Sequence, residues 1–178
     1  MKSNQIVSFW GTVLANFFLA FGAWALPGEN DATFANSNLQ TTVSALLPFA
    51  DGRVLAGLNN GAYTNGGTNF GSLVRLSANG TPDASFLQSD TNKYTIYGLT
   101  LLSDSNLLVS GNFTSYSGTG RKTIVKLDAT GALINNFTSG VNSTTKIFTG
   151  EQPDGKIIVA GSNLRNTNSL LIPVVARL

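Results

Sequence analysis

The sequence repeats itself at an interval of about 51 residues. The matching segments LVRL, IVKL and VARL end in leucines spaced 51 residues apart, at Leu76, Leu127 and Leu178. A second set of anchors recurs at steps of 52 and 51 residues, at Phe34, Phe86 and Phe137. Self-similarity at such a period is the signature of an array of structural units, none of which buries its apolar surface alone. The interval therefore predicts a repeat architecture.

Each repeat has the pattern of short strands and tight turns. Only 11% of the residues are charged, there are 19 glycines, and no long segment shows a helical period. In the second repeat we predict strands at 94–102, 106–111, 122–127 and 132–137. The corresponding segments are 41–48, 53–57, 72–76 and 81–86 in the first repeat, and 145–152, 156–161 and 171–178 in the third. Four short antiparallel strands in about 50 residues is the content of one propeller blade.

The second strand of each repeat is apolar on both faces, at 54–56, 107–109 and 157–160. A two-layer sandwich would show alternating polar and apolar residues there, whereas sheets stacked face to face bury both sides. We therefore predict an all-β, β-propeller-like repeat array of about three four-stranded antiparallel blades. The repeats span approximately 31–86, 87–137 and 138–178, the last without its fourth strand. Because propellers have about four to eight blades, we expect a partial propeller or one completed by association.

The first 25 residues have the pattern of a signal peptide. Lys2 precedes an apolar run at 6–25, and the small residues Ala23 and Ala25 stand where a signal peptidase reads. We predict cleavage after Ala25 and a mature domain at 26–178. The alternative is an uncleaved anchor, because the run approaches the ~20 residues that span a bilayer.

Composition excludes several classes of chemistry. The chain has no cysteine and no histidine, which removes disulfides, thiolate zinc sites and every Ser-His-Asp or Cys-His arrangement. Six of the seven aspartates occupy predicted turns without clustered metal-ligand spacing, so we expect no metal and no cofactor. Without Lys2 the chain has 10 basic and 9 acidic residues, a net charge of +1. We expect no nucleic-acid partner.

The repeat motifs resemble a known family. The segment QPDGKIIVAG at 152–161 resembles the QPDGKILVGG core of the bacterial delta-60 repeat. GNFTSYSG at 111–118, IVKLDATGAL at 124–133 and DASF at 83–86 are similar to the segments that follow it. The second repeat departs from the core by having Asp104-Ser105-Asn106 in place of Asp-Gly-Lys. The resemblance implies a β-propeller in secreted or surface bacterial proteins, and it implies no activity.

Two carboxylates are candidates for acid–base catalysis. Glu151 stands where the other repeats have Leu101 and Pro48, and Asp90 has no counterpart at its position. A carboxylate on an apolar strand can have a raised pKa, and a pair at the right separation hydrolyses glycosides. The alternative is that Glu151 lies at an exposed rim.

Three cations recur with the repeat and must point the same way in each unit: Arg75, Lys126 and Arg177. One interpretation is a cationic ring that binds a carboxylate or sulfate. The other is that each cation pairs with a turn aspartate and packs through its aliphatic stem.

Aromatic and amide side chains in the long loops suggest a glycan site. Sugars stack on aromatic faces beside amide and hydroxyl donors, and the candidates are Tyr63, Asn112, Phe113 and Tyr116. The alternative is ordinary loop composition.

We therefore expect an exported structural or interaction module without catalysis, found in the medium, the periplasm or on the cell surface of a bacterium. Its expected partners are other copies of itself or other repeat blades. Binding of a carbohydrate or surface polymer is the alternative, and a glycoside hydrolase is the third. A membrane contact would come only from an uncleaved N-terminal segment.

Overall fold

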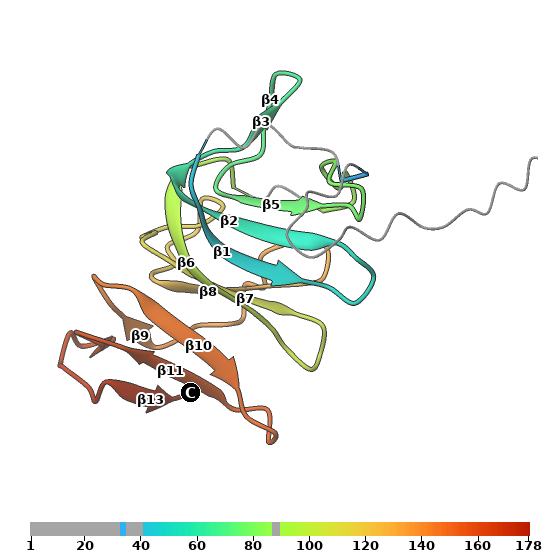
Figure 1. Ribbon diagram of the computed structural model, residues 1–178. Helices are drawn as coiled ribbons and strands as arrows, with labels where there is room; N and C mark the ends of the chain where they lie inside the picture. The colour runs from blue at the N-terminus through green and yellow to red at the C-terminus, as the bar shows by residue number, and fades with distance from the viewer. Residues whose placement is uncertain (1–32, 35–40, 87–89) are drawn as a thin grey trace, which may run out of the picture. The chain divides into compact units, whose positions relative to one another are not determined.

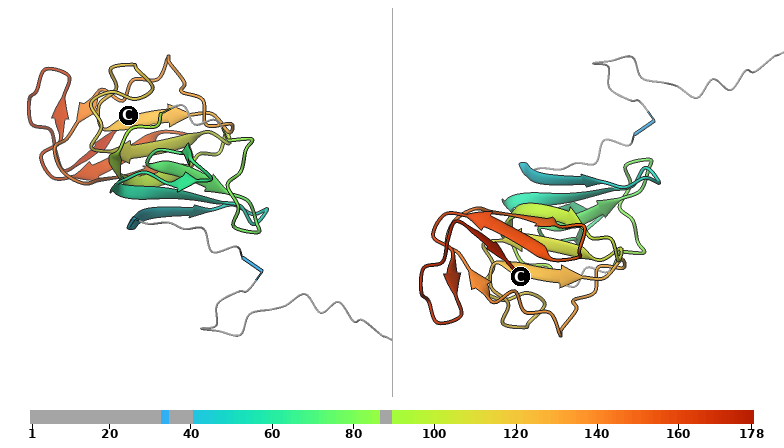
Figure 2. Two further views of the ribbon diagram at one scale, coloured as in Figure 1. Left: turned by 90° about the horizontal axis from the view of Figure 1, so that it is seen from above. Right: turned by 90° about the horizontal axis from the view of Figure 1, so that it is seen from below.

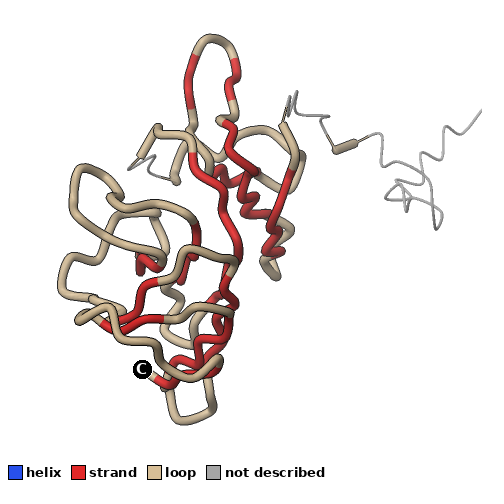
Figure 3. Tube along the Cα trace, turned by 90° about the vertical axis from the view of Figure 1, so that its left-hand side faces the viewer, coloured by secondary structure: helices blue, strands red, loops and turns tan. Residues whose placement is uncertain are grey.

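The computed structural model describes residues 33–34, 41–86 and 90–178, and these contain strands and turns but no helix (Figure 3). Two compact units are distinguished, Met1–Thr33 and Phe34–Leu178, and the fold described here is that of the second. The predicted signal peptide at 1–25 lies outside the described residues. Within the described ranges no helix is long and apolar enough to cross a membrane.

Each repeat forms one antiparallel sheet, here called a blade, whose middle strand is the second in sequence (Figure 1). Blade 1 contains β1 (Val43–Pro48), β2 (Val54–Gly61) and β5 (Leu73–Leu76). Blade 2 contains β6 (Tyr94–Leu101), β7 (Leu107–Gly111) and β8 (Ile124–Leu127). Blade 3 contains β10 (Ile147–Glu151), β11 (Ile157–Gly161) and β13 (Val175–Arg177). The prediction of an all-β repeat array is confirmed.

The predicted fourth strand is reduced to a single bridge. Leu76 pairs with Pro82 in blade 1, and Leu127 pairs with Leu133 in blade 2. Directly afterwards the chain turns, with the Phe86 N–H donating to the Asp83 carbonyl at 3.1 Å. These segments therefore place one aromatic side chain each instead of continuing the sheet.

The hairpin between the first two strands is the same in all three blades. In each hairpin an aspartate carboxylate accepts a hydrogen bond from the backbone N–H two residues later. The donors are Arg53 to Asp51, Asn106 to Asp104 and Lys156 to Asp154. The residue after each aspartate is left-handed, with φ of 86° at Gly52, 65° at Ser105 and 78° at Gly155. The second repeat therefore keeps the turn geometry although serine replaces glycine.

Short pairings gather at the opposite end of the sheets from these hairpins. The β3 strand (Thr64–Asn65) pairs with β4 (Thr68–Asn69), and β9 (Val141–Asn142) pairs with β12 (Arg165–Asn166). The end of β2 also pairs with the start of β6, through Asn59 with Thr95 and Gly61 with Tyr94. This ladder joins blade 1 to blade 2.

Blade 2 lies between the other two blades, and each junction contains its own apolar cluster (Figures 1 and 2). Leu55 and Leu73 of blade 1 pack against Val109 and Val125 of blade 2. The other face of blade 2 packs against blade 3 through the cluster of Leu108, Ile124, Ile147 and Val159. All five residues of β7 are buried, which confirms the predicted two-sided burial of that strand. In β11, Ile158 and Ala160 are only half-buried, because no sheet among the described residues covers their face.

The closing phenylalanine of each repeat packs at a junction between blades. Phe86 belongs to the cluster that joins blade 1 to Leu107 and Leu127 of blade 2, and the Arg75 guanidinium of blade 1 lies over its ring. Phe137 packs at the junction of blades 2 and 3. Phe34, which precedes blade 1, packs against the cluster on the outer face of that blade. One phenylalanine that precedes each blade therefore packs against that blade.

Candidate functional site

The two candidate catalytic carboxylates are far apart. The Asp90 carboxylate accepts a hydrogen bond from the Tyr94 hydroxyl at 3.0 Å, at the start of β6. Glu151 lies beside the other end of β6, where it accepts the Ser103 N–H at 2.6 Å and the Ser103 hydroxyl at 2.9 Å. A strand advances ~3.3 Å per residue, so the length of β6 holds them roughly 20 Å apart. Glycoside hydrolysis needs carboxylates within about 5–10 Å of each other, and this pair cannot act on one bond.

The candidate aromatic residues are parts of the core. Tyr63 is 2% exposed, Phe113 2% and Tyr116 4%. Tyr63 packs on Phe70, while Phe113 and Tyr116 form an edge-to-face pair with ring centroids 5.5 Å apart. Asn112 uses its amide oxygen to accept the Thr95 N–H at 2.8 Å. Packing covers the faces of these rings, so they are not open for a sugar to stack on, and the glycan site stays a prediction.

The recurring cations occupy equivalent positions, as predicted. Arg75 is the cross-strand partner of Leu55, Lys126 of Leu108 and Arg177 of Ile158, so each cation lies on the face directed at the next blade.

The first two cations are already paired within the protein. The Arg75 guanidinium is 4% exposed and donates from Nε to Asp83 at 2.8 Å. Lys126 pairs with Asp104 at 2.8 Å, and this hydrogen bond lowers the pKa of Asp104 to about 2. These contacts match the alternative of pairing with turn aspartates, and neither cation is left for an anion. The Arg177 side chain has no ion pair or hydrogen bond within the described ranges.

The face of blade 3 directed away from blade 2 is apolar and uncovered. Phe148 is 58% exposed and Val175 is 55% exposed, and Ala160 lies between them, half-buried like the neighbouring Ile158. Their cross-strand partners place these residues on one face together with Ala160 and Arg177. The positions equivalent to Ile158 and Val175 in blade 2 are Leu108 and Ile124, which are buried under blade 3.

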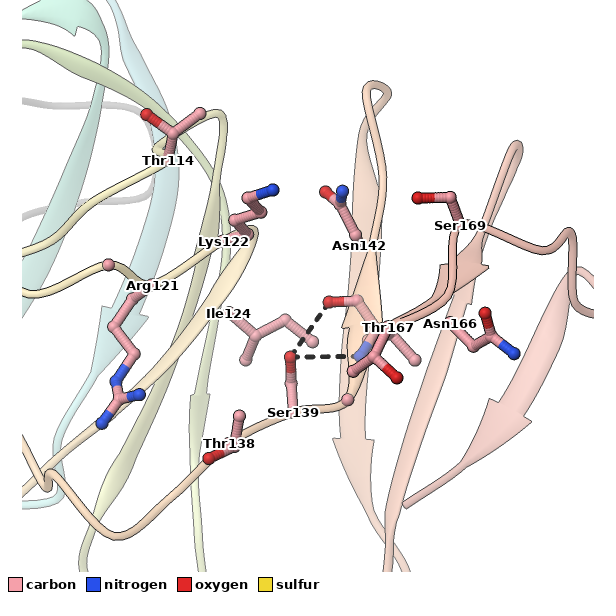
Figure 4. Close-up of a pocket in the computed structure, with 13 residues that line it drawn as sticks. Thr114, Arg121, Lys122, Ile124, Thr138, Ser139, Asn142, Asn166, Thr167 and Ser169 are labelled. Carbon is pink, nitrogen blue, oxygen red and sulfur yellow. Dashed lines mark hydrogen bonds between the residues drawn. The ribbon is translucent and has the colours of Figure 1, made fainter.

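A cavity of about 310 Å³ lies at the loop end of the junction between blades 2 and 3 (Figure 4). Its wall on the blade 2 side carries Arg121 and Lys122, and Asn142 faces Lys122 across the opening. No aspartate or glutamate lines it, and most of the remaining wall presents hydroxyls, amides and backbone. The lining residues are Thr114, Gly120, Arg121, Lys122, Ile124, Thr138, Ser139, Gly140, Val141, Asn142, Asn166, Thr167 and Ser169.

Neither cation of this cavity has an acidic partner among the residues that the structure describes. Arg121 donates from Nη2 to the Asn135 carbonyl, and its Nε is buried without a hydrogen-bond partner. The Lys122 ammonium makes no ion pair with the described residues. Such an arrangement attracts an anion.

A family of β-propeller domains of unknown function, DUF5122, matches three segments at 50–86, 102–137 and 152–178. Together these cover more than half of the chain. The chain belongs to this family. Each matched DUF5122 segment runs from the hairpin of one blade to the end of its repeat, which is the repeat expected from the delta-60 resemblance. No curated protein matches the chain.

Lys122 lies within the matched DUF5122 segment 102–137, whereas Gly140 and Asn142 lie between two matched segments. Lys122 stands 51 residues after Gly71, and Gly140 stands 50 residues after Asp90. Lys122, Asn142 and Phe148 are not among the residues predicted from the sequence. The sequence distinguishes Lys122 only by a difference between repeats, because the corresponding residue of the first repeat is Gly71. A search for residues that recur in every repeat does not find such a difference.

Proposed function

We propose that this DUF5122 β-propeller protein is an exported structural module that assembles through the open face of blade 3. The observation that carries the proposal is the exposure of Phe148 and Val175 on a face whose equivalent in blade 2 is buried by the next sheet. Unpartnered apolar sheet faces of this kind mark interaction sites.

The occupant of this face is blade 1 of a second copy. Blades 1 and 2 already join face to face in this manner, so the same kind of contact continues the array. The outer face of blade 1 presents Leu46, which is 62% exposed, at the margin of the cluster in which Ala56 and Val74 are already buried. Head-to-tail contacts of this type produce closed rings or open filaments.

The solution mass of the protein tests the proposal. We expect concentration-dependent association in analytical ultracentrifugation, and we expect Phe148→Asp and Leu46→Asp each to shift the protein to a monomer. Leu101→Asp is the control, because Leu101 is 42% exposed but lies on blade 2. A wild-type monomer at every concentration would contradict assembly. Loss of association with Phe148→Asp but not with Leu46→Asp would contradict the head-to-tail arrangement.

Export rests on the sequence of residues 1–25 alone. The basic residue, the apolar run and the Ala-Trp-Ala end support cleavage after Ala25. N-terminal sequencing of the protein recovered outside the cytoplasm should begin at Leu26. A chain that retains Met1 there would contradict cleavage.

A further inference from the structure

One buried arginine connects blade 1 to blade 2. Arg75 is 4% exposed, and it donates from Nε to the Asp83 carboxylate at 2.8 Å and from Nη2 to the Ser85 hydroxyl at 3.1 Å. Its Nη1 crosses the junction and donates at 2.7 Å to the carbonyl of Ala129, in the turn that follows β8 of blade 2. The guanidinium also lies over the ring of Phe86, 4.6 Å from its centroid. This arginine therefore joins its own blade, the closing segment of its repeat and the next blade.

The second junction has neither the arginine nor the aspartate. In the first repeat the Asp83 N–H donates to the Arg75 carbonyl at 2.8 Å. The Ile134 N–H donates to the Lys126 carbonyl at 2.9 Å in the same way, so Ile134 occupies the position of Asp83. Lys126 pairs instead with Asp104 in the hairpin of its own blade. Arginine and aspartate thus occur together in the first repeat and are both replaced in the second, and a lysine cannot form the planar contact of several donors that an arginine forms.

Blade 3 has the arginine again, at Arg177, but without its acceptors. Arg177 occupies the position of Arg75, on the face of blade 3 that is directed away from blade 2. It is exposed, and its side chain makes no ion pair or hydrogen bond within the described ranges. The aspartate of the blade 3 hairpin, Asp154, pairs with Lys156. The open face of blade 3 therefore presents a guanidinium with all its donors available.

The outer side of blade 1 presents groups that correspond to the acceptors of Arg75. Ala78 stands 51 residues before Ala129, in the turn that follows β5. It is exposed, and its carbonyl accepts no hydrogen bond from the described residues. Phe34 stands 52 residues before Phe86 and packs against the outer face of blade 1. Phe34 is only half-buried, whereas Phe86 is 4% exposed, so part of the Phe34 side chain is still uncovered.

The segment before blade 1 repeats the closing motif together with its aspartate. Residues 31–34 read DATF and residues 83–86 read DASF, so Asp31 corresponds to Asp83. Asp31 itself lies outside the described residues. The closing segment before blade 3 has an isoleucine in this place. The repeat therefore matches the second aspartate, before blade 1, with the second arginine, Arg177 of blade 3.

We propose that Arg177 of one copy binds blade 1 of the next copy in the way that Arg75 binds across the first junction. Its acceptors are the Asp31 carboxylate and the Ala78 carbonyl of that next copy. The inference rests on the head-to-tail assembly proposed above and names the contact that orients it. Within one copy blade 2 separates the open face of blade 3 from the outer face of blade 1, so these two faces meet only between copies. The apolar residues supply contact area, and the ion pair fixes the register because a covered cation needs its carboxylate.

Charge reversal followed by analytical ultracentrifugation tests the contact. We expect Arg177→Glu and Asp31→Arg each to raise the dissociation constant of the assembly at least about 30-fold, because each leaves two like charges facing each other at the interface. Lys93→Glu is the control. It makes the same change in net charge as Arg177→Glu, at an exposed residue that precedes β6 of blade 2, and it should associate like the wild type.

An equimolar mixture of the two variants separates loss of the contact from damage to the fold. In an alternating assembly one kind of interface joins the two substituted residues, and the other kind joins the unsubstituted Arg177 and Asp31. Both interfaces then have opposite charges. We expect the mixture to associate like the wild type at a concentration where neither variant associates alone.

The outcomes distinguish this contact from the assembly itself. A wild-type monomer at every concentration contradicts the assembly and this contact with it. If the wild type associates and Phe148→Asp does not, association of Arg177→Glu with wild-type affinity overturns the contact and leaves the assembly standing. Failure of the mixture to associate would show that Arg177 and Asp31 do not pair between copies. Equal weakening by Lys93→Glu would show an effect of net charge alone, and it too would overturn the proposal.

Discussion

Ser105 adopts a left-handed backbone conformation that the other two hairpins assign to a glycine. It has φ of 65° where the equivalent residues are Gly52 and Gly155. A residue with a side chain pays about 1–2 kcal/mol of strain in the left-handed region, and glycine relieves this strain. Glycine also raises the conformational entropy of the unfolded chain, which offsets part of the stabilisation. We expect Ser105→Gly to raise the free energy of unfolding by about 0.5–1 kcal/mol in urea denaturation.

The reverse substitution provides the matched control. Gly155→Ser introduces the same strain into the hairpin of blade 3, where φ is 78°. It should lower the free energy of unfolding by a similar amount. Destabilisation by Ser105→Gly would show that the serine side chain contributes more than its backbone conformation costs.

Asp83 makes the stability of the protein sensitive to acid. Burial alone would raise the pKa of Asp83, but hydrogen bonds from Ser85 and Arg75 together lower the pKa to about 2. Because the folded-state pKa lies below the ordinary value of 3.8, its contribution is complete above pH ~4 and is lost as the pH falls toward 2. After allowance for solvent screening we expect this contribution to be about 1–2 kcal/mol.

The test compares Asp83→Asn with the wild type across this range. The difference in free energy of unfolding should be largest near neutral pH and should shrink between pH ~4 and ~2. Asp154→Asn is the control, because Asp154 pairs with Lys156 on the surface with 47% of its side chain exposed. A difference for Asp83→Asn that does not change with pH would contradict the assignment.

At the scale of strands, Gly57 allows blades 1 and 2 to approach closely. A Cβ on Gly57 would lie 2.5 Å from Cγ2 of Ile96, which is fully buried between the blades. Gly57→Ala forces this junction apart, and overpacking of this kind costs about 1–3 kcal/mol. Thermal unfolding should show a lowered Tm for Gly57→Ala.

Gly150 in β10 is the control for this substitution, because a Cβ there meets nothing within 4 Å. Gly150→Ala should leave the Tm unchanged or raise it slightly, since alanine reduces the entropy of the unfolded chain. Equal effects of the two substitutions would contradict close packing at Gly57.

The strands could largely be predicted from the sequence, and the side-chain environments could not. The middle strands β2, β7 and β11 follow from runs of apolar residues between turn signals, and their register follows from the repeat. The burial of Phe113 and Tyr116 could not be read from composition, because both lie in a polar loop segment that folds back over the core. The distance between Glu151 and Asp90 could not be predicted, because it depends on their lying beside opposite ends of β6.

The three blades of the molecule differ in how much of their surface is buried. All five residues of β7 are buried, whereas β13 has exposed Val175 and Arg177. Local opening is easiest where few apolar contacts must be broken. In native-state hydrogen exchange we expect the amides of β7 to exchange slowest and those of β13 to exchange fastest among the blade strands.

This gradient also reports on assembly. If a second copy covers the open face, raising the protein concentration should slow exchange in β13 and leave β7 unchanged. Protection of β13 equal to that of β7 at a concentration where the chain is monomeric would contradict the gradient.

Because each closing phenylalanine lies at a junction, one period of about 51 residues contains a sheet together with an aromatic ring that packs it against its neighbour. A coding segment of one period, duplicated by unequal recombination, adds a complete sheet together with the aromatic ring that seals it, wherever within the period the crossover falls. A lineage can therefore lengthen or shorten such an array in steps of about 51 codons without first evolving a new junction.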